Sequence, residues 1–157
     1  MDDVVIVRAL HVLAVIHWIG GLSFVTLVIL PLARSDRLAA HAQLLFEDVE
    51  RHFSAQVRVS IPIAGMTGLW MTYRMDLWDR FADPNFWWMP AMFGLWLIFM
   101  LMLFVIEPLF HAKFERTAMQ DSRVAFWRLS RLHEFFLLLA AVTAMGAVAG
   151  SHGLEFF

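Results

Sequence analysis

Four apolar segments set the limits on what this chain can fold into. They lie at about residues 4–32, 57–73, 87–110 and 132–150. The hydrocarbon core of a bilayer is about 30 Å thick, and a helix needs about 20 residues to cross it. In lipid only helices and closed barrels satisfy their backbone groups, and the run Leu95–Leu101 lacks the alternation that a barrel strand requires. The sequence therefore predicts an all-α integral membrane protein, in which residues 1–157 form a single transmembrane domain, a bundle of four helices.

The composition supports this interpretation. Hydrophobic residues make up 61% of the chain and charged residues 17%, against about 45–50% and about 25% in soluble domains. A soluble domain of this size cannot bury so much apolar surface, so the excess is expected to face a lipid bilayer. Cys is absent, which excludes a disulfide scaffold, an iron–sulfur cluster and a thiolate metal site. The net charge of −2 gives no reason to expect a nucleic-acid partner.

Positive charges predict the orientation of the helices, because cytoplasmic connections are enriched in Lys and Arg. Nine of the twelve such residues follow the first and third apolar segments: Arg34, Arg37, Arg51, Arg58, Lys113, Arg116, Arg123, Arg128 and Arg131. The acidic Asp2 and Asp3 argue against a cleavable signal peptide, so we expect the first segment to remain. The sequence thus predicts a multi-pass protein of a bacterial inner membrane, with both termini in the periplasm.

The first connection contains an amphipathic segment over residues 35–56. Its apolar residues recur at helical spacing, with charges between them: Leu38, Ala42, Leu45, Phe46, Val49 and Phe53. Such a pattern is typical of a helix with one apolar face. The segment is expected either to lie on the inner membrane surface, between the first and second transmembrane helices, or to extend the second helix inward.

Glycines and aromatic residues occur at the places where helices are expected to meet each other or the membrane surface. Pairs of glycines lie in three of the apolar segments: Gly20 and Gly21, Gly65 and Gly68, and Gly146 and Gly150. They allow close helix packing, or they make room for a flat cofactor. The outer connection is rich in aromatic residues that we interpret as interfacial anchors: Trp78, Phe81, Phe86, Trp87 and Trp88.

Histidines are the most informative polar residues, because an imidazole inside hydrocarbon is costly and therefore a functional candidate. His11 and His17 lie in the first apolar segment, and His152 lies just past the outer end of the fourth. Three more are expected near the inner surface: His52, His111 and His133. The alternative for each is solvation at the interface or a hydrogen bond to a neighbouring helix.

Imidazoles from facing helices are typical axial ligands of a b-type haem. We expect His11 and His152 to hold an outer haem, with Arg8 near its propionates. His133, with His52 as a further candidate, would serve any inner haem, because the 19 residues between His133 and His152 span about 28 Å of helix. The sequence therefore predicts one or two haems per chain.

His17 occupies a different face of its helix. It lies six residues after His11, which places it about 120° further around the helix axis. The two side chains therefore do not ligate one iron from the same face. We regard His17 as a second ligand candidate, a proton relay or a residue that supports the ligand.

Two other groups permit different chemistry. Glu107, followed by Pro108, is expected either to relay protons or to pair with a cytoplasmic Arg. Thioethers bind Cu(I), often with a His, and four methionines share the outer level with His11: Met71, Met75, Met89 and Met92. A copper site is thus an alternative to haem, although most of the ten methionines are expected to fill apolar space.

One short motif resembles a known group of proteins. Arg8-Ala9-Leu10-His11, followed by Trp18-Ile19-Gly20-Gly21-Leu22, resembles the opening of CopD-type and HemJ-type bacterial membrane proteins. HemJ-type proteins are haem b-binding protoporphyrinogen oxidases in which the His of this motif is implicated, so the resemblance implies haem binding through His11. CopD-type proteins are associated with copper uptake or resistance. His17 stands where HemJ-type sequences have another residue.

The leading hypothesis is a membrane-embedded haem b protein that transfers electrons between the quinone pool or a partner complex and an acceptor. Such a protein would act alone, as a homodimer or within a larger respiratory-type complex. The alternatives are a HemJ-type protoporphyrinogen oxidase, CopD-type copper handling, and an accessory subunit without a cofactor. Whether the chain is an enzyme is left open by its residues.

Overall fold

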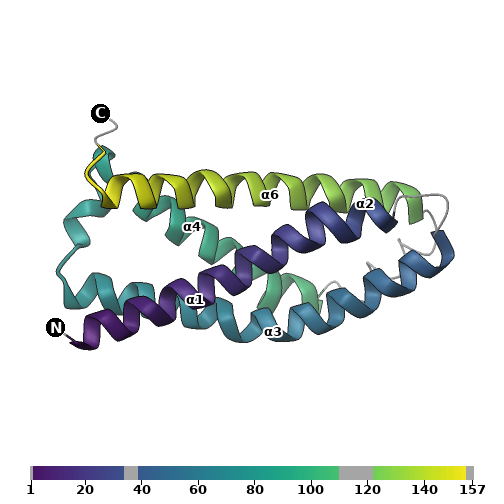
Figure 1. Cartoon of the computed structure of the whole chain (residues 1–157), viewed down its shortest axis with the longest axis horizontal. Coiled ribbons are helices and arrows are strands. Elements are labelled where there is room, and N and C mark those ends of the chain that lie inside the picture. The colour runs from purple at the N-terminus through teal and green to yellow at the C-terminus, as the bar shows by residue number, and fades with distance from the viewer. Residues whose placement is uncertain (1, 34–38, 110–121, 155–157) are drawn as a thin grey trace.

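The computed structural model describes residues 2–33, 39–109 and 122–154, and every regular element in these ranges is a helix (Figure 1). The longest helices run along the long axis of the molecule, and the first of them crosses the others obliquely. The expectation of an all-α fold is therefore confirmed for the described residues.

The first apolar segment folds as one rod. It consists of three consecutive pieces: α1 (Asp2–Phe24), the π-helical η1 (Val25–Ile29) and α2 (Leu30–Ala33). Within η1 the buried Thr26 hydroxyl donates to the Leu22 carbonyl one turn earlier, at 2.6 Å. The rod begins before the expected residue 4, because the carboxylates of Asp2 and Asp3 are favourable in a first helical turn.

The second apolar segment is the C-terminal half of a longer helix, α3 (Ala39–Arg74). The amphipathic segment is continuous with it, so of the two expected arrangements the structure has the extension of the second helix rather than a separate surface helix. The reason is that no Gly or Pro interrupts the chain between Ala39 and Pro62. Pro62 lies inside α3, and next to it the Trp96 indole donates to the Ile61 carbonyl at 3.0 Å.

The third and fourth apolar segments form the other two rods. The third comprises α4 (Trp88–Leu101) and the π-helical η4 (Met102–Ile106), and the helix continues to Leu109. The fourth is α6 (Ser122–Ser151), which begins ten residues before the expected start at 132. The helix starts earlier than expected because an apolar run shows only which part of a helix suits lipid. It does not show where the helix itself begins. Two short 3-10 helices, η2 (Trp78–Phe81) and η3 (Pro84–Phe86), precede α4.

Three of the helices in the described residues are long and apolar enough to cross a membrane. They span Asp2–Leu32, Trp88–Leu109 and Trp127–Ser151. The apolar part of α3, residues 57–73, is shorter and includes Arg58 together with several small and hydroxyl side chains, and α3 is not among the three. Three of the four apolar segments thus form helices that could cross a membrane, as the sequence predicts.

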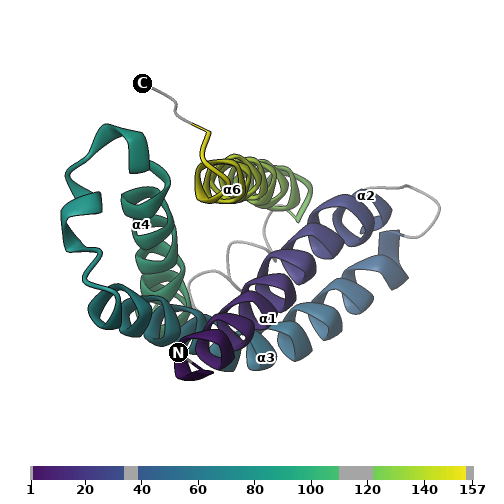
Figure 2. The same cartoon turned by 60° about the vertical axis from the view of Figure 1, so that its left-hand side comes forward.

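A hydrophobic core joins the four rods. Its buried residues come from α1, α3, α4 with η4, and α6: Ala14, Trp18, Val57, Ile61, Ala64, Leu95, Leu103 and Ala140. The main packing partner of α1 is α3, and α4 packs against α6 (Figure 2). The start of α1 and the end of α6 lie at the same end of the long axis (Figure 1). Between these two points the chain therefore runs the length of the molecule an even number of times.

Glycines in these helices are covered by aromatic rings. A Cβ on Gly65 would collide with the Trp96 indole, and a Cβ on Gly146 would collide with the Trp87 indole. The same holds for Gly21 under Phe53 and for Gly150 under Trp88. The glycines thus serve close packing, and Trp87 and Trp88 pack on α6 rather than acting solely as membrane anchors.

Substitution of Gly65 tests this packing. Gly65→Ala is expected to destabilise the protein by about 1–3 kcal/mol, because the Trp96 ring is held by its hydrogen bond to Ile61 and has to shift. Gly94→Ala is the matched control, since a Cβ at Gly94 meets no atom within 4 Å. Thermal unfolding in detergent, followed by circular dichroism, measures both. Equal unfolding midpoints for the two variants would contradict the proposed packing.

Candidate functional site

The interface between α1 and α3 carries two histidines of α1, and the first is His11. Its Nδ1 lies 2.8 Å from the Ala64 carbonyl oxygen and 3.1 Å from Thr67 Oγ1. A carbonyl oxygen only accepts hydrogen bonds, so Nδ1 carries the proton. In the neutral imidazole Nε2 then keeps its lone pair, and no partner occupies it among the described residues. His11 is half-buried and packs against Gly68, whose Cβ would lie 3.2 Å from its ring.

His17 is held differently, because both of its ring nitrogens have partners on α3. Nε2 lies 3.1 Å from Gln56 Oε1, and Nδ1 lies 3.1 Å from Ser60 Oγ. The amide oxygen only accepts, so Nε2–H donates to Gln56, and Nδ1 accepts from the Ser60 hydroxyl. The imidazole of His17 is therefore committed to cross-linking α1 and α3, whereas that of His11 retains a free nitrogen.

A shallow open groove runs beside His17 between the two helices. Eight residues line it: Leu10, Leu13, Ala14, His17, Gln56, Val59, Ser60 and Ile63. His17 and Gln56 are exposed, whereas Ser60 is buried. The groove thus has apolar walls and one polar group of three side chains, contributed by both helices.

The residues of α3 that receive the two imidazoles were not identified from the sequence. Gln56, Ser60 and Thr67 follow one stripe of the helix together with Ala64, at intervals of three or four residues. A polar stripe inside an otherwise apolar segment is the signal that would have revealed them.

His152 and His133 both lie on α6 or directly after it. Their Nδ1 atoms are bonded to carbonyls one turn earlier, His152 to Val148 at 2.8 Å and His133 to Leu129 at 2.9 Å. His152 is exposed and His133 is half-buried. Since α6 is one uninterrupted helix, these two residues stand at well-separated levels, as the sequence predicts.

The structure does not bring His11 and His152 into contact. No hydrogen bond or ring contact joins them among the described residues, and His152 follows the last residue of α6. His11 lies nine residues after Asp2, about 14 Å along α1. Their pairing around one haem stays a prediction.

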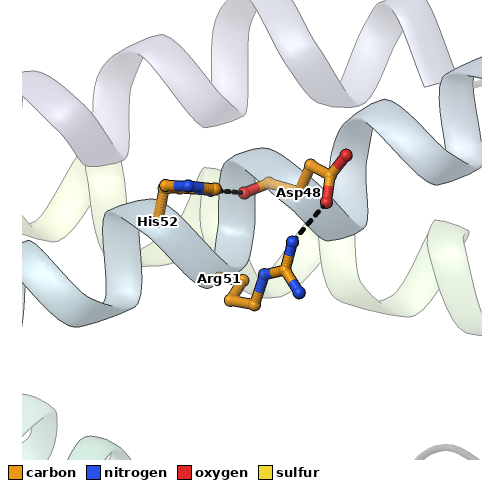
Figure 3. A network of polar contacts seen from close by, with 3 residues as sticks. All are labelled: Asp48, Arg51 and His52. Atoms are coloured by element: carbon orange, nitrogen blue, oxygen red, sulfur yellow. Dashed lines mark hydrogen bonds and ion pairs between the residues drawn. The ribbon is translucent and has the colours of Figure 1, made fainter.

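His52 lies in the N-terminal half of α3. Its Nδ1 lies 2.8 Å from the Asp48 carbonyl oxygen, and Arg51 Nη2 donates to the Asp48 carboxylate at 2.7 Å (Figure 3). All three side chains belong to one helix and are exposed. His52 therefore interacts with its own helix rather than with His133, and His111 lies outside the described residues.

Arg8 and the methionines bear on the copper alternative. Arg8 Nη2 lies 3.9 Å from Met75 Sδ, which places a cation beside one of the thioethers expected to bind Cu(I). The described residues contain no group of three or more His, Asp or Glu side chains arranged for a metal ion. A copper site built on thioethers stays a hypothesis.

Glu107 pairs with Arg58, as one of its two interpretations predicts. Arg58 Nη2 donates to Glu107 Oε1 at 2.8 Å, joining α3 to the helix that continues from η4. The two side chains are 44% and 39% exposed, so solvent or lipid headgroups screen the pair. A proton relay through Glu107 stays a hypothesis.

The motif that resembles CopD-type and HemJ-type proteins lies entirely on α1. Trp18 and Leu22 are buried, and Trp18 meets the Phe99 ring edge-on at 4.9 Å. No protein-family model, no curated protein and no solved structure matches this chain. The family resemblance therefore stays a prediction.

A double-mutant cycle tests the ion pair of Arg58 and Glu107. Arg58→Met leaves a carboxylate without its cation, so the double variant with Glu107→Gln is expected to recover stability relative to Arg58→Met alone. The coupling is expected to be about 1 kcal/mol or less, given the exposure of both side chains. The same cycle on Arg51 and Asp48, which are 74% and 65% exposed, serves as the control with a smaller coupling. Additive effects at Arg58 and Glu107 would show that the contact contributes nothing.

Proposed function

We propose that this chain is a membrane-embedded haem b protein that transfers electrons, with His11 as an axial ligand of the iron. The observation that carries the proposal is the hydrogen bond from His11 Nδ1 to the Ala64 carbonyl. When an imidazole binds a metal through one nitrogen, a hydrogen bond from the N–H of its other nitrogen to a protein acceptor fixes its tautomer and its orientation. The opposite nitrogen, Nε2, is then presented to the metal.

The rest of the donor set fits the same group. His152 also has Nδ1 on a backbone carbonyl and is the proposed second axial ligand, from this chain or from a second copy in a homodimer.

Haem b, when bound, carries one electron at a time, and its potential depends on its axial ligands and their hydrogen bonds. The residues of this chain contribute the orientation and the environment. Ala64 and Thr67 hold the His11 imidazole in place at the edge of the apolar core of the four rods. His133, with His52 as a further candidate, is the proposed ligand of any inner haem.

The proposal places the protein in a bacterial inner membrane, with four passes and both termini in the periplasm. The apolar part of α3, residues 57–73, would be the fourth pass. Two observations support this arrangement: the start of α1 and the end of α6 share one end of the molecule (Figure 1), and Lys and Arg gather in the connections at residues 34–58 and 113–131.

Copper handling is less well supported than haem binding. The thioether of Met75 accepts a contact from the Arg8 guanidinium, and a cation beside the ligand disfavours a second positive charge. A HemJ-type oxidase activity would use the same haem ligand, His11, and so is a specific form of the proposed function.

Haem content in His→Ala variants tests the assignment of the ligand. His11→Ala is expected to lose most of the b-type absorbance of the purified protein, because the imidazole with the free Nε2 is removed. His17→Ala is the matched control on the same helix and is expected to retain haem, because both nitrogens of His17 bond to α3. Reduced-minus-oxidised spectra per folded chain give the result. Retained haem in His11→Ala would refute His11 as a ligand.

The orientation is testable by thiol labelling, since the natural chain contains no Cys. In Leu154→Cys, at the end of α6, a membrane-impermeant maleimide is expected to react in intact spheroplasts. In Arg51→Cys, on the inward extension of α3, it is expected to react only after permeabilisation. Both residues are exposed, so reactivity reports the side of the membrane. Labelling of Arg51→Cys alone in intact spheroplasts would invert the proposed orientation.

A further inference from the structure

We propose that the groove between α1 and α3 binds the headgroup of a lipid-soluble quinone, with the Gln56 amide nitrogen as the hydrogen-bond donor and with His17 and Ser60 holding that amide in place. This inference rests on the proposed function for its redox purpose, because the quinone would be the electron partner of the haem. The binding itself uses none of the proposed haem ligands. His11 faces Ala64 and Thr67 instead.

The shape of the groove suits a molecule with an apolar tail and a compact polar head. Five of its eight lining residues are apolar: Leu10, Leu13, Ala14, Val59 and Ile63. The groove is open along its side, and Leu10, Leu13, Val59 and Ile63 are exposed large hydrophobic residues of the kind that face lipid. A ligand would therefore enter from the bilayer and keep its tail against these side chains.

The polar end of the groove has hydrogen-bond donors to spare. The Gln56 amide oxygen accepts from His17 Nε2, while the Gln56 amide nitrogen has no partner among the described residues. The Ser60 hydroxyl donates to His17 Nδ1 and so orients the imidazole. The imidazole in turn orients the Gln56 amide through its bond to the amide oxygen. A donor that is fixed in place and exposed in an apolar groove requires an acceptor. The carbonyl oxygens of a quinone are acceptors only.

The lining of the groove separates a quinone from a phospholipid. The eight lining residues include no Lys or Arg, so the phosphate of a phospholipid headgroup would lack a cation to pair with. A quinone ring is neutral and its oxygens are acceptors only, so it matches the chemistry of the Gln56 amide.

The groove also lies close to the proposed haem ligand. His17 and His11 are six residues apart on α1, about 9 Å along the helix axis. A quinone at Gln56 would thus lie within one to two helical turns of His11. Electron exchange between a quinone and a haem needs this kind of proximity, which the α1–α3 interface provides.

The test is calorimetric titration of the detergent-purified full chain with a short-chain ubiquinone. Gln56→Leu is expected to raise the Kd about tenfold, the effect of removing one hydrogen bond to a ligand. Ser54→Ala is the matched control, because Ser54 lies on the same helix, two residues earlier, and does not line the groove. Its affinity is expected to equal that of the natural protein.

A second titration needs no variant. The isoprenoid tail without the quinone ring is added as a competitor, and it is expected to displace the quinone only weakly. Equal displacement would show an ordinary lipid groove and overturn the proposal, and so would equal affinity in the natural protein and Gln56→Leu. A colourless protein that binds quinone through Gln56 refutes the haem function alone. A haem-loaded protein that binds no quinone refutes this site alone.

Discussion

The structure depends on one constraint: an imidazole in an apolar helix needs hydrogen-bond partners within the protein. On α1 the two imidazoles of His11 and His17 meet this constraint entirely through α3, by bonds to the Ala64 carbonyl and to the side chains of Thr67, Gln56 and Ser60. These bonds fix the rotation of α1 against α3. They also decide which nitrogen of each imidazole remains available, and thereby link the packing of the helices to the chemistry of the site.

The rest of the fold is built around this pair of helices. The Trp96 indole packs over Gly65 and donates to Ile61, so α4 is attached to the face of α3 beside Pro62. Trp87 and Trp88 pack over glycines of α6 in the same manner. Rings on glycines thus bring α4 close to α3 and α6 close to α4, and the apolar core around Trp18 draws on all four rods. His11 is held half-buried at the edge of that core.

Much of the helical plan could be predicted from the sequence, because long apolar runs in lipid have few alternatives to a helix. The fusion of the amphipathic segment with α3 was one of two open alternatives, and it depends on the unbroken chain before Pro62. His11 and His17 stood out by their cost in an apolar segment. Their partners did not, because the rotation of α3 against α1 is a tertiary property. An ion pair between Glu107 and an Arg was predicted from the sequence, but the identity of the Arg was not. Arg58 is the partner because α3 packs against η4 and the helix that continues from it.

The central claim is that His11 presents a free nitrogen to a haem iron. The most direct measurement is the visible spectrum of the natural protein, purified in detergent and reduced with dithionite, with haem quantified per chain. We expect sharp b-type bands and about one haem per chain, or about two if the inner histidines also ligate. A folded protein without absorbance in the visible range, purified from cells supplied with haem, would contradict it.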